Sequence, residues 1–266
     1  MELAMMNKKN IWILFSFLWI LFFVVYIAPH LISVMFRQKK LFNARVENNG
    51  MFSLSPGLAQ IAESKTVKNS QKYRVKEFVV VTDQYKGLSV KQVGDHKQLY
   101  AGYVAKRNEI DEKLQSVDKS KSNASYSGFR GLKISETFTR NASLLHELYF
   151  ENIAPGKKIG KATEKLIIDN FGSLESFKDD LMATATAARG WALMCYNLDD
   201  KRVQNYLLDA HNQLVPVMTI PLLVIDIYEH AYMIDFGINK KEYLAVLWNN
   251  INWDVVEARV KALIVK

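Results

Sequence analysis

The sequence is poor in cysteine and lacks a long block of charge of one sign, and each absence excludes a class of protein. Cys195 is the only cysteine among the 266 residues, which excludes an intrachain disulfide and any zinc or iron–sulfur site built from several cysteines. The formal net charge is +8, but the basic residues are scattered among acidic ones, as in "NKKEYL". This pattern disfavours a nucleic-acid partner and leaves an anionic membrane surface or a small anion as the partner of a basic chain.

An apolar run near the N-terminus is long enough to cross a membrane. "IWILFSFLWILFFVVYIA", residues 11–28, has Ser16 as its only strongly polar residue, and "PHLISVMF" extends the run to Phe36. At about 1.5 Å per residue, such a run spans a hydrocarbon core of roughly 30 Å. No A-x-A cleavage site follows it. Residues 1–36 are therefore predicted to be a single transmembrane anchor rather than a cleaved signal peptide.

The charges around this run predict its orientation. Before it stand Lys8 and Lys9, partly offset by Glu2, whereas Arg37, Lys39, Lys40 and Arg45 follow it. Because cytoplasmic loops carry an excess of Lys and Arg, the body is expected on the cytoplasmic or matrix side, with the mitochondrial inner membrane as the favoured location.

The middle of the chain divides into a spacer and a helical part. Residues 37–87 are rich in Asn, Ser, Gly and Lys without sustained periodicity, which predicts a spacer. From residue 88, apolar residues at three- and four-residue steps predict two helices. The first opens with Ser89 as its N-cap, and the second ends before Pro155. They are expected to form an antiparallel hairpin domain, residues 88–156.

Residues 157–266 mix both patterns. "KATEKLIIDNFGSLESFKDDLMATATAA" is predicted to be helical with a break at Gly172–Ser173, and "KKEYLAVLWNNINWDVVEARVKALI" is predicted to be a closing helix. Between them "GWALMCYNL", "KRVQNYLLDA" and "IPLLVIDI" are predicted to be three antiparallel strands. The predicted fold class is α+β: a helical hairpin, then a mixed domain with a small three-stranded antiparallel sheet, plus the N-terminal transmembrane helix.

Four polar groups stand among residues that should be buried. They are the imidazoles of His96, His146 and His230 and the carboxylate of Asp226. A lone histidine in such a setting is more often a hydrogen-bonded core residue than a ligand. Three nitrogens and one oxygen that converge, however, suit a first-row transition metal with room left for solvent. Spacing alone does not establish that the helices bring them together.

Several segments together resemble a known family. "PLLVIDIYEHAYMIDF", followed by "KKEYLAVLWNNINWD", resembles the D-x-W-E-H-A-Y signature of iron/manganese superoxide dismutases and the N-x-x-N-W-D/E segment after it. "LHELYFENIAP", "FGSLESFK" and "GWALMCYN" resemble, in the same order, that family's second ligand helix, domain-opening helix and first strand. The resemblance covers about residues 88 to 260. It implies the dismutase fold, one iron or manganese ion per chain, and conversion of superoxide to oxygen and hydrogen peroxide.

The resemblance also implies the ligands of that ion. They would be His96, His146, Asp226 and His230. Glu229 matches the acid that reaches a ligand histidine across a dimer, which implies a homodimer or a pair with a related dismutase-fold chain. Its simpler interpretation is a charge on a surface helix.

Further positions match residues that surround the metal in the family. Tyr103 would gate the substrate channel, and Gln213 would hydrogen-bond the metal-bound solvent. His211 is an alternative for the second role, because loop length blurs the alignment. Trp191 and Tyr228 would line the site or its interface.

The chain also departs from the commonest family pattern. There the first ligand histidine lies eight residues before the channel tyrosine, which here is Asp95, whereas His96 lies seven before. We predict His96, and Asp95 remains the alternative. Tyr228 and Leu193 replace tryptophans and Met233 replaces a tyrosine, whose usual histidine partner corresponds here to Leu99 or Tyr100.

These departures leave room for other functions. One is a weak or inactive dismutase-fold subunit of a larger membrane complex, for example in the respiratory chain. Another is a hydrophobic-pocket binding module in which His96 and His146 are only core residues. The predicted function remains a membrane-anchored superoxide dismutase that acts on superoxide.

Overall fold

The computed structural model describes residues 72–78, 85–154 and 158–264, which belong to one compact unit, Ser70–Lys266. The predicted anchor, residues 1–36, and most of the predicted spacer lie outside these residues. Among the helices that the structure describes, none combines the length and apolar character needed to span a bilayer.

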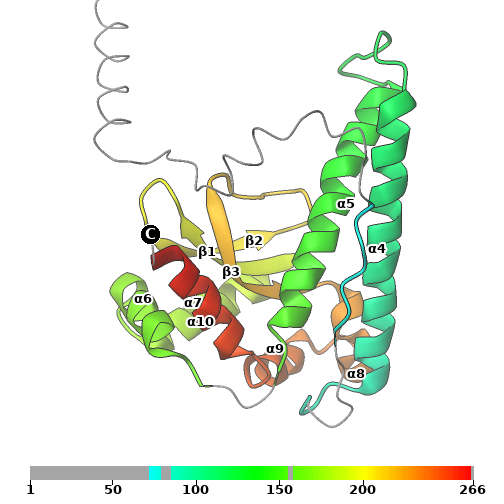
Figure 1. The fold of residues 1–266 in the computed structure, drawn as a ribbon. Coiled ribbons are helices and arrows are strands. Elements are labelled where there is room, and N and C mark those ends of the chain that lie inside the picture. Colours follow the sequence, from blue (N-terminus) through cyan, green and yellow to red (C-terminus); the bar gives the residue numbers. More distant parts are fainter. Residues whose placement is uncertain (1–71, 79–84, 155–157, 265–266) are drawn as a thin grey trace, which may run out of the picture. The chain divides into compact units, whose positions relative to one another are not determined.

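Two long antiparallel helices form the predicted hairpin (Figure 1). They are α4, Val90–Ser116, and α5, Gly128–Glu151. The Oγ atom of Ser89 accepts the Gln92 backbone N–H at 3.0 Å, so the predicted N-cap of α4 is confirmed, and Ser127 caps α5 in the same way. Such caps satisfy backbone donors that the first helical turn leaves without partners.

The predicted helical segment after residue 160 is confirmed, including its break. It consists of α6, Lys161–Phe171, and α7, Leu174–Ala187. Gly172 ends α6 at a φ of +81°, a conformation that glycine adopts without steric cost. The Ser173 side chain then caps α7 by accepting the Ser176 N–H.

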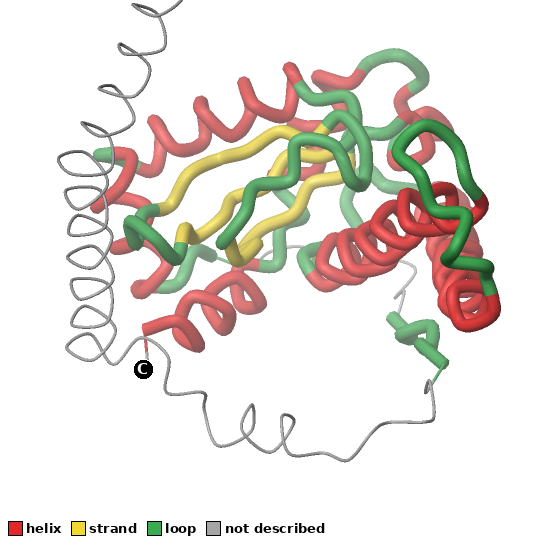
Figure 2. The backbone as a smooth tube through the Cα atoms, turned by 90° about the horizontal axis from the view of Figure 1, so that it is seen from above, coloured by secondary structure: helices red, strands yellow, loops and turns green. Residues whose placement is uncertain are grey.

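The three predicted strands form one antiparallel sheet with the order β2-β1-β3. Their bounds are Trp191–Asn197 for β1, Val203–Leu208 for β2 and Thr219–Asp226 for β3. Helix α7 packs against β1 and β2, while α5 and α10 pack against β3. Figure 2 shows the sheet lying between these helices. The contact between α5 and β3 brings the hairpin next to the strand that ends at Asp226.

The prediction of one closing helix is wrong, because the chain forms two. They are α9, Lys240–Trp248, and α10, Trp253–Ile264. The residues between them bond to other parts of the chain: the Asn250 side chain pairs with the backbone of Lys86, and Ala154 donates its N–H to the Asn250 carbonyl. These bonds between distant segments replace the helical ones.

Two short helical turns follow β3. The 3₁₀ turn η2, Glu229–Ala231, is followed by α8, Met233–Phe236. Tyr232 between them has φ −146° and ψ −18°, which are not helical values. This irregular segment carries the predicted ligand His230.

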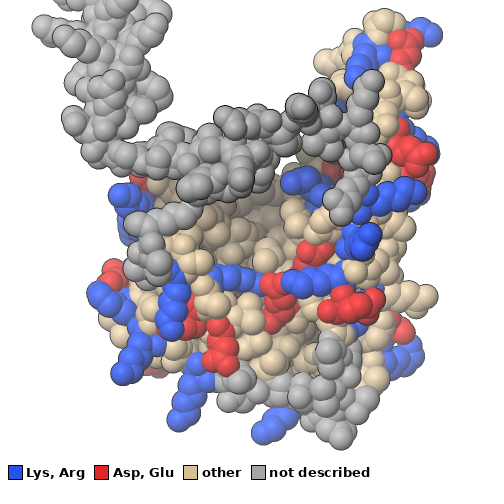
Figure 3. Space-filling model, viewed as in Figure 1, with Lys and Arg blue, Asp and Glu red and all other residues tan. Residues whose placement is uncertain are grey.

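Residues 72–78, part of the predicted spacer, lie against the hairpin as an extended segment (Figure 1). The backbone of Tyr73 exchanges two hydrogen bonds with the Asn108 side chain, at 2.8 and 2.9 Å. The Tyr73 hydroxyl donates to Glu147 at 2.7 Å, and the Tyr100 hydroxyl donates to the same carboxylate at 2.8 Å. Nearby, Lys and Arg are mixed with Asp and Glu across this face of the molecule (Figure 3).

Candidate metal centre

The structure brings together all four predicted ligands. His96, His146, Asp226 and His230 each offer one atom, and these atoms all lie within 4.8 Å of one another. They come from α4, α5, the last residue of β3 and η2. Three are buried, with exposed fractions of 2%, 0% and 0% for His96, His146 and Asp226. His230 keeps 26% of its side chain exposed.

One carboxylate oxygen stands at the centre of the group. Asp226 Oδ2 lies 3.1 Å from His96 Nε2, 3.2 Å from His230 Nε2 and 3.6 Å from His146 Nε2. The other oxygen, Oδ1, accepts the Tyr228 backbone N–H at 2.9 Å, which directs Oδ2 toward the three rings.

The electrostatics hold these groups in the protonation states that metal binding requires. Burial opposes ionisation of Asp226, but its hydrogen bonds with His230 and His96 hold the pKa of this carboxyl well below its ordinary value. Burial lowers the pKa of His146 to about 3 and also lowers the pKa of His96. The carboxylate is therefore ionised and these two imidazoles neutral at pH 7, as in a ligand set.

The tautomer of His146 follows from its own helix. Its Nδ1 lies 2.7 Å from the carbonyl oxygen of Ala142. A carbonyl only accepts, so Nδ1 carries the hydrogen and Nε2 keeps its lone pair. His146 Nε2 is buried without a hydrogen-bond partner in the part of the chain that the structure describes. A buried lone pair facing two imidazole nitrogens and a carboxylate oxygen fits an iron or manganese ion.

The structure answers the question of register in α4. Asp95 is exposed on the outer side of the helix, where it pairs with Lys91 one turn earlier. His96 points the other way, into the group of ligands. The shortened spacing to Tyr103 therefore places an imidazole in the site, and the two-carboxylate alternative does not fit this geometry.

The structure places His211, and not Gln213, at the inner position. Gln213 is exposed, because a tight turn, closed by its N–H bond to the Ala210 carbonyl at 3.2 Å, carries it outward. His211 is 1% exposed, and its ring lies 5.8 Å from that of His146. The alternative named from the sequence is the one that the fold favours.

Trp191 fixes the tautomer of His211. Its indole N–H donates to His211 Nδ1 at 3.0 Å, and burial lowers the pKa of His211 to about 4. An indole can only donate, so Nδ1 must accept and the hydrogen of the neutral ring sits on Nε2. His211 is thus a neutral N–H donor beside the ligands.

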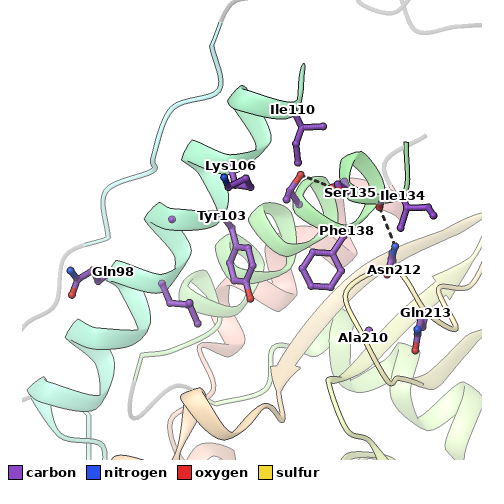
Figure 4. A pocket seen from close by; sticks show the side chains of 13 residues that line it. Gln98, Tyr103, Lys106, Ile110, Ile134, Ser135, Phe138, Ala210, Asn212 and Gln213 are labelled. Atoms are coloured by element: carbon purple, nitrogen blue, oxygen red, sulfur yellow. Dashed lines mark hydrogen bonds between the residues drawn. The ribbon is translucent and has the colours of Figure 1, made fainter. Parts of the chain in front are cut away.

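Tyr103 lies at the inner end of a surface cavity of about 810 Å³. Its ring is 5.2 Å from His146 and 4.9 Å from His211. Figure 4 shows Tyr103 and Phe138 side by side, from the two helices of the hairpin, with Gln213 across the cavity. Leu99 also lines this cavity. Tyr103 thus lines the cavity and also lies next to His146 and His211.

The remaining predicted residues lie around the site. Tyr228 stacks on His230 with ring centroids 5.1 Å apart and lies 6.2 Å from Trp191. Glu229 is exposed next to His230, and Met233 is 43% exposed.

Sequence reasoning missed a buried pair of tyrosines that supports Asp226. The Tyr243 hydroxyl donates to the Asp226 carbonyl at 2.8 Å and lies 3.2 Å from the Tyr149 hydroxyl. It also missed Gln92, a fully buried amide beside His230. The sequence carries a weak signal for both, since each is a polar group within an apolar helical stripe.

Comparison with known proteins agrees with this geometry. A family profile described as "Iron/manganese superoxide dismutases, C-terminal domain" matches residues 159–259. An iron superoxide dismutase of Aquifex aeolicus is 44% identical over 179 residues, which are 65% of this chain and 84% of that protein. The chain belongs to the iron/manganese superoxide dismutase family. The resemblance drawn from the motifs is thereby confirmed.

Other members of the superoxide dismutase family are also similar. The iron superoxide dismutase of Saccharolobus solfataricus is 32% identical, over 65% of this chain and 83% of that protein. A manganese superoxide dismutase of Haloferax volcanii is 28% identical, over 62% of this chain and 82% of that protein. None of the three is described as a membrane protein or as a subunit of a larger complex, so those predictions gain no support from them.

Proposed function

We propose that this chain is a superoxide dismutase that uses one iron or manganese ion. The observation that carries the proposal is the convergence of His96, His146, Asp226 and His230, with ligand atoms within 4.8 Å of one another. The accessory-subunit and pocket-binding alternatives are not favoured, because neither needs a buried lone pair on His146 opposite an ionised carboxylate.

The overall reaction consumes two superoxide anions and two protons and yields one dioxygen and one hydrogen peroxide. His96, His146, Asp226 and His230 would hold an iron or manganese ion, which would supply the one-electron redox chemistry of the reaction. The protein must hold that ion, admit a small anion and deliver protons.

Two residues beside the ligands, His211 and Tyr103, serve the delivery of protons, and Trp191 orients one of them. His211 offers a neutral Nε2–H that does not depend on pH near neutrality, since Trp191 occupies its Nδ1. Tyr103 lines the cavity, and its ring lies 5.2 Å from that of His146. Burial raises the pKa of its hydroxyl, which therefore stays protonated as a donor. Together they form a path by which protons reach a bound anion.

The test is a direct measurement on the full-length chain, purified in a mild detergent. Metal analysis is expected to find about one iron or manganese per chain, and pulse-radiolysis assays to show superoxide consumption. A His146→Ala variant should lose both. A folded wild-type chain that binds neither metal and consumes no superoxide would overturn the proposal.

The proposal extends to location on the strength of the sequence. The apolar run of residues 11–36 would anchor the enzyme, with its body on the cytoplasmic or matrix side. Membranes washed with alkaline carbonate should retain the chain, and protease should reach its body only from the predicted side. Release by the wash would refute the anchor without affecting the dismutase proposal.

A second copy of the chain is the proposed partner. Glu229 is exposed immediately beside His230, where it is available to a neighbouring subunit. Sedimentation in detergent should give a dimer, and Glu229→Ala should weaken it. A wild-type monomer that consumes superoxide at full rate would refute this assignment.

A further inference from the structure

We propose that Gln92 is a positioning residue, which sets the direction of His230 by inserting its side-chain amide into the backbone of the loop that carries this histidine. The inference deepens the proposed function, because it rests on His230 being a metal ligand. It concerns contacts that are complete within one chain.

The contacts of Gln92 are short and buried. Its side chain is 1% exposed. Gln92 Nε2 donates to the His230 carbonyl at 2.6 Å, and the Ile234 backbone N–H donates to Gln92 Oε1 at 3.0 Å. A single carboxamide therefore satisfies one backbone acceptor and one backbone donor of the same loop.

Those two backbone groups are the ones that an α-helix would join to each other. His230 and Ile234 are four residues apart, so in an α-helix the N–H of Ile234 would donate directly to the carbonyl of His230. Here the Gln92 amide stands between them and bonds to both. The loop accordingly splits into η2 and α8, with Tyr232 in a non-helical conformation between them.

Neighbouring backbone bonds agree with this insertion. Tyr232 donates to the Glu229 carbonyl at 3.1 Å, closing the 3₁₀ turn, and Phe236 donates to the Tyr232 carbonyl at 2.9 Å, opening α8. Backbone hydrogen bonds of the helical type are thus present both before and after the inserted amide. Without that amide, the two freed groups of His230 and Ile234 would bond to each other, since buried backbone groups are rarely left without partners.

Closure of that bond would move the ligand. His230 sits in the turn that the insertion creates, and its Nε2 reaches Asp226 Oδ2 at 3.2 Å. A continuous helix through residues 229–236 would rotate His230 relative to β3, because the non-helical step at Tyr232 would be lost.

Gln92 also couples two ligands. It lies four residues before His96 on α4, so both side chains project from the same face of the helix. One therefore contacts the loop of His230 while the other contacts Asp226. A second bond, from the Ser89 N–H to Asp235 Oδ2 at 2.6 Å, fastens the same two segments one turn away.

The experiment replaces Gln92 by methionine, which has nearly the same length and shape but neither hydrogen-bonding group. The matched control is Gln115→Met, an exposed glutamine near the other end of the same helix. Both variants are made in the full-length chain. Gln92→Leu, which likewise has neither hydrogen-bonding group, serves as a second variant.

Three readouts separate positioning from a general loss of stability. Iron should leave Gln92→Met for an external chelator about 10- to 100-fold faster than it leaves the wild type, the range typical for residues that orient metal ligands. The electron paramagnetic resonance spectrum of the ferric protein should change shape. In metal-free protein labelled with ¹⁵N-isoleucine, the amide resonance of Ile234 should move. Gln115→Met should leave all three unchanged, and Gln92→Leu should change them in the same direction as Gln92→Met.

The results also distinguish this inference from the proposed function. Iron loss within twofold of wild type, together with an unchanged spectrum in both Gln92 variants, would overturn the positioning role. An unchanged Ile234 resonance in Gln92→Met would overturn the inserted amide itself, whether or not metal is present. A wild type without iron or manganese would instead refute the proposed function and the ligand role of His230, while the Ile234 resonance would still decide whether Gln92 holds the loop.

Discussion

The helical half and the sheet half of the metal centre are supported in different ways. His96 and His146 stand within helices of 27 and 24 residues, and His146 is oriented by a carbonyl of its own helix. Asp226 ends a strand, and His230 sits in a three-residue turn that bonds to Gln92 of the other half. His146 is oriented by its own helix, whereas His230, on a short turn, depends on a side chain from a distant part of the chain.

The largest effect is expected where the two halves meet, at Asp226. Asp226→Asn removes the negative charge that faces three histidines, so iron or manganese content and superoxide consumption should both fall to roughly a tenth of wild type or less. Asp95→Asn is the matched control, because Asp95 is exposed, and should keep both. Loss of metal in the control would mean that the register in α4 is the alternative one.

The second largest effect is expected in the pH dependence of the free energy of unfolding, measured on the metal-free chain, because of its buried histidines. His146 and His211 have pKa values lowered by burial to about 3 and about 4, below the ordinary value near 6.5. Below pH 6.5 the unfolded chain takes up protons that the folded chain does not, so stability is complete above that pH and falls as the pH drops toward 4. Each such histidine should contribute about 1.4 kcal/mol per pH unit.

Urea unfolding of the metal-free chain at pH 7, 6 and 5 would measure this slope. His211→Gln, which cannot titrate, should reduce the slope by the share of one histidine. A free energy of unfolding that does not change over this range would contradict the prediction.

A smaller effect, on the free energy of unfolding, is expected at Tyr243, which supports Asp226 in the sheet half. Tyr243→Phe leaves the buried Asp226 carbonyl without the hydroxyl that lies 2.8 Å away, and a buried acceptor left without its partner costs about 1–3 kcal/mol. Urea denaturation should show this loss. Tyr126, which is 90% exposed, provides the control: Tyr126→Phe should change the free energy of unfolding by much less, and equal losses would show that the buried bond contributes nothing.

The smallest effect is expected at the outer surface of the helical half. Tyr73→Phe removes one of the two tyrosine hydroxyls that donate to Glu147, but Tyr100 still donates to that carboxylate. The ring at position 73 can still stack on Arg107, whose Cζ lies 3.7 Å from the Tyr73 ring centroid. The expected loss is about 1 kcal/mol with unchanged metal content. A Tyr73→Phe variant that lost its metal would show that the two halves are less independent than their contacts indicate.

Much of the fold could be predicted, because its information is local. Apolar residues at helical spacing gave the hairpin, Gly172 and Ser173 marked the break between α6 and α7, and β-branched and aromatic runs gave the three strands. The division of the last helix could not be read in this way, because it depends on bonds from Asn250 to Lys86 and Ala154, which are far away in the sequence.

In the site, too, the residues marked by local sequence could be predicted, and those that depend on distant contacts could not. The four ligands stand out as polar groups in apolar stretches, and the resemblance to the family implied their roles. His211 and Gln213 differ by two positions in one tight turn, and only the path of that turn decides which side chain faces inward. Gln92 lies outside every motif. Its place in an apolar helical stripe is only a weak signal, and its two backbone partners become known only from the fold.

The extended segment at residues 72–78 has a mechanical consequence. A pull on residue 72 would reach the body at Tyr73, which is hydrogen-bonded to Asn108 and Glu147. Those two residues belong to α4 and α5, the longest helices that the structure describes. The load would thus pass first into these two long helices, and the contacts of Gln92 in α4 and of its N-cap Ser89 would carry it on to the segment that holds His230.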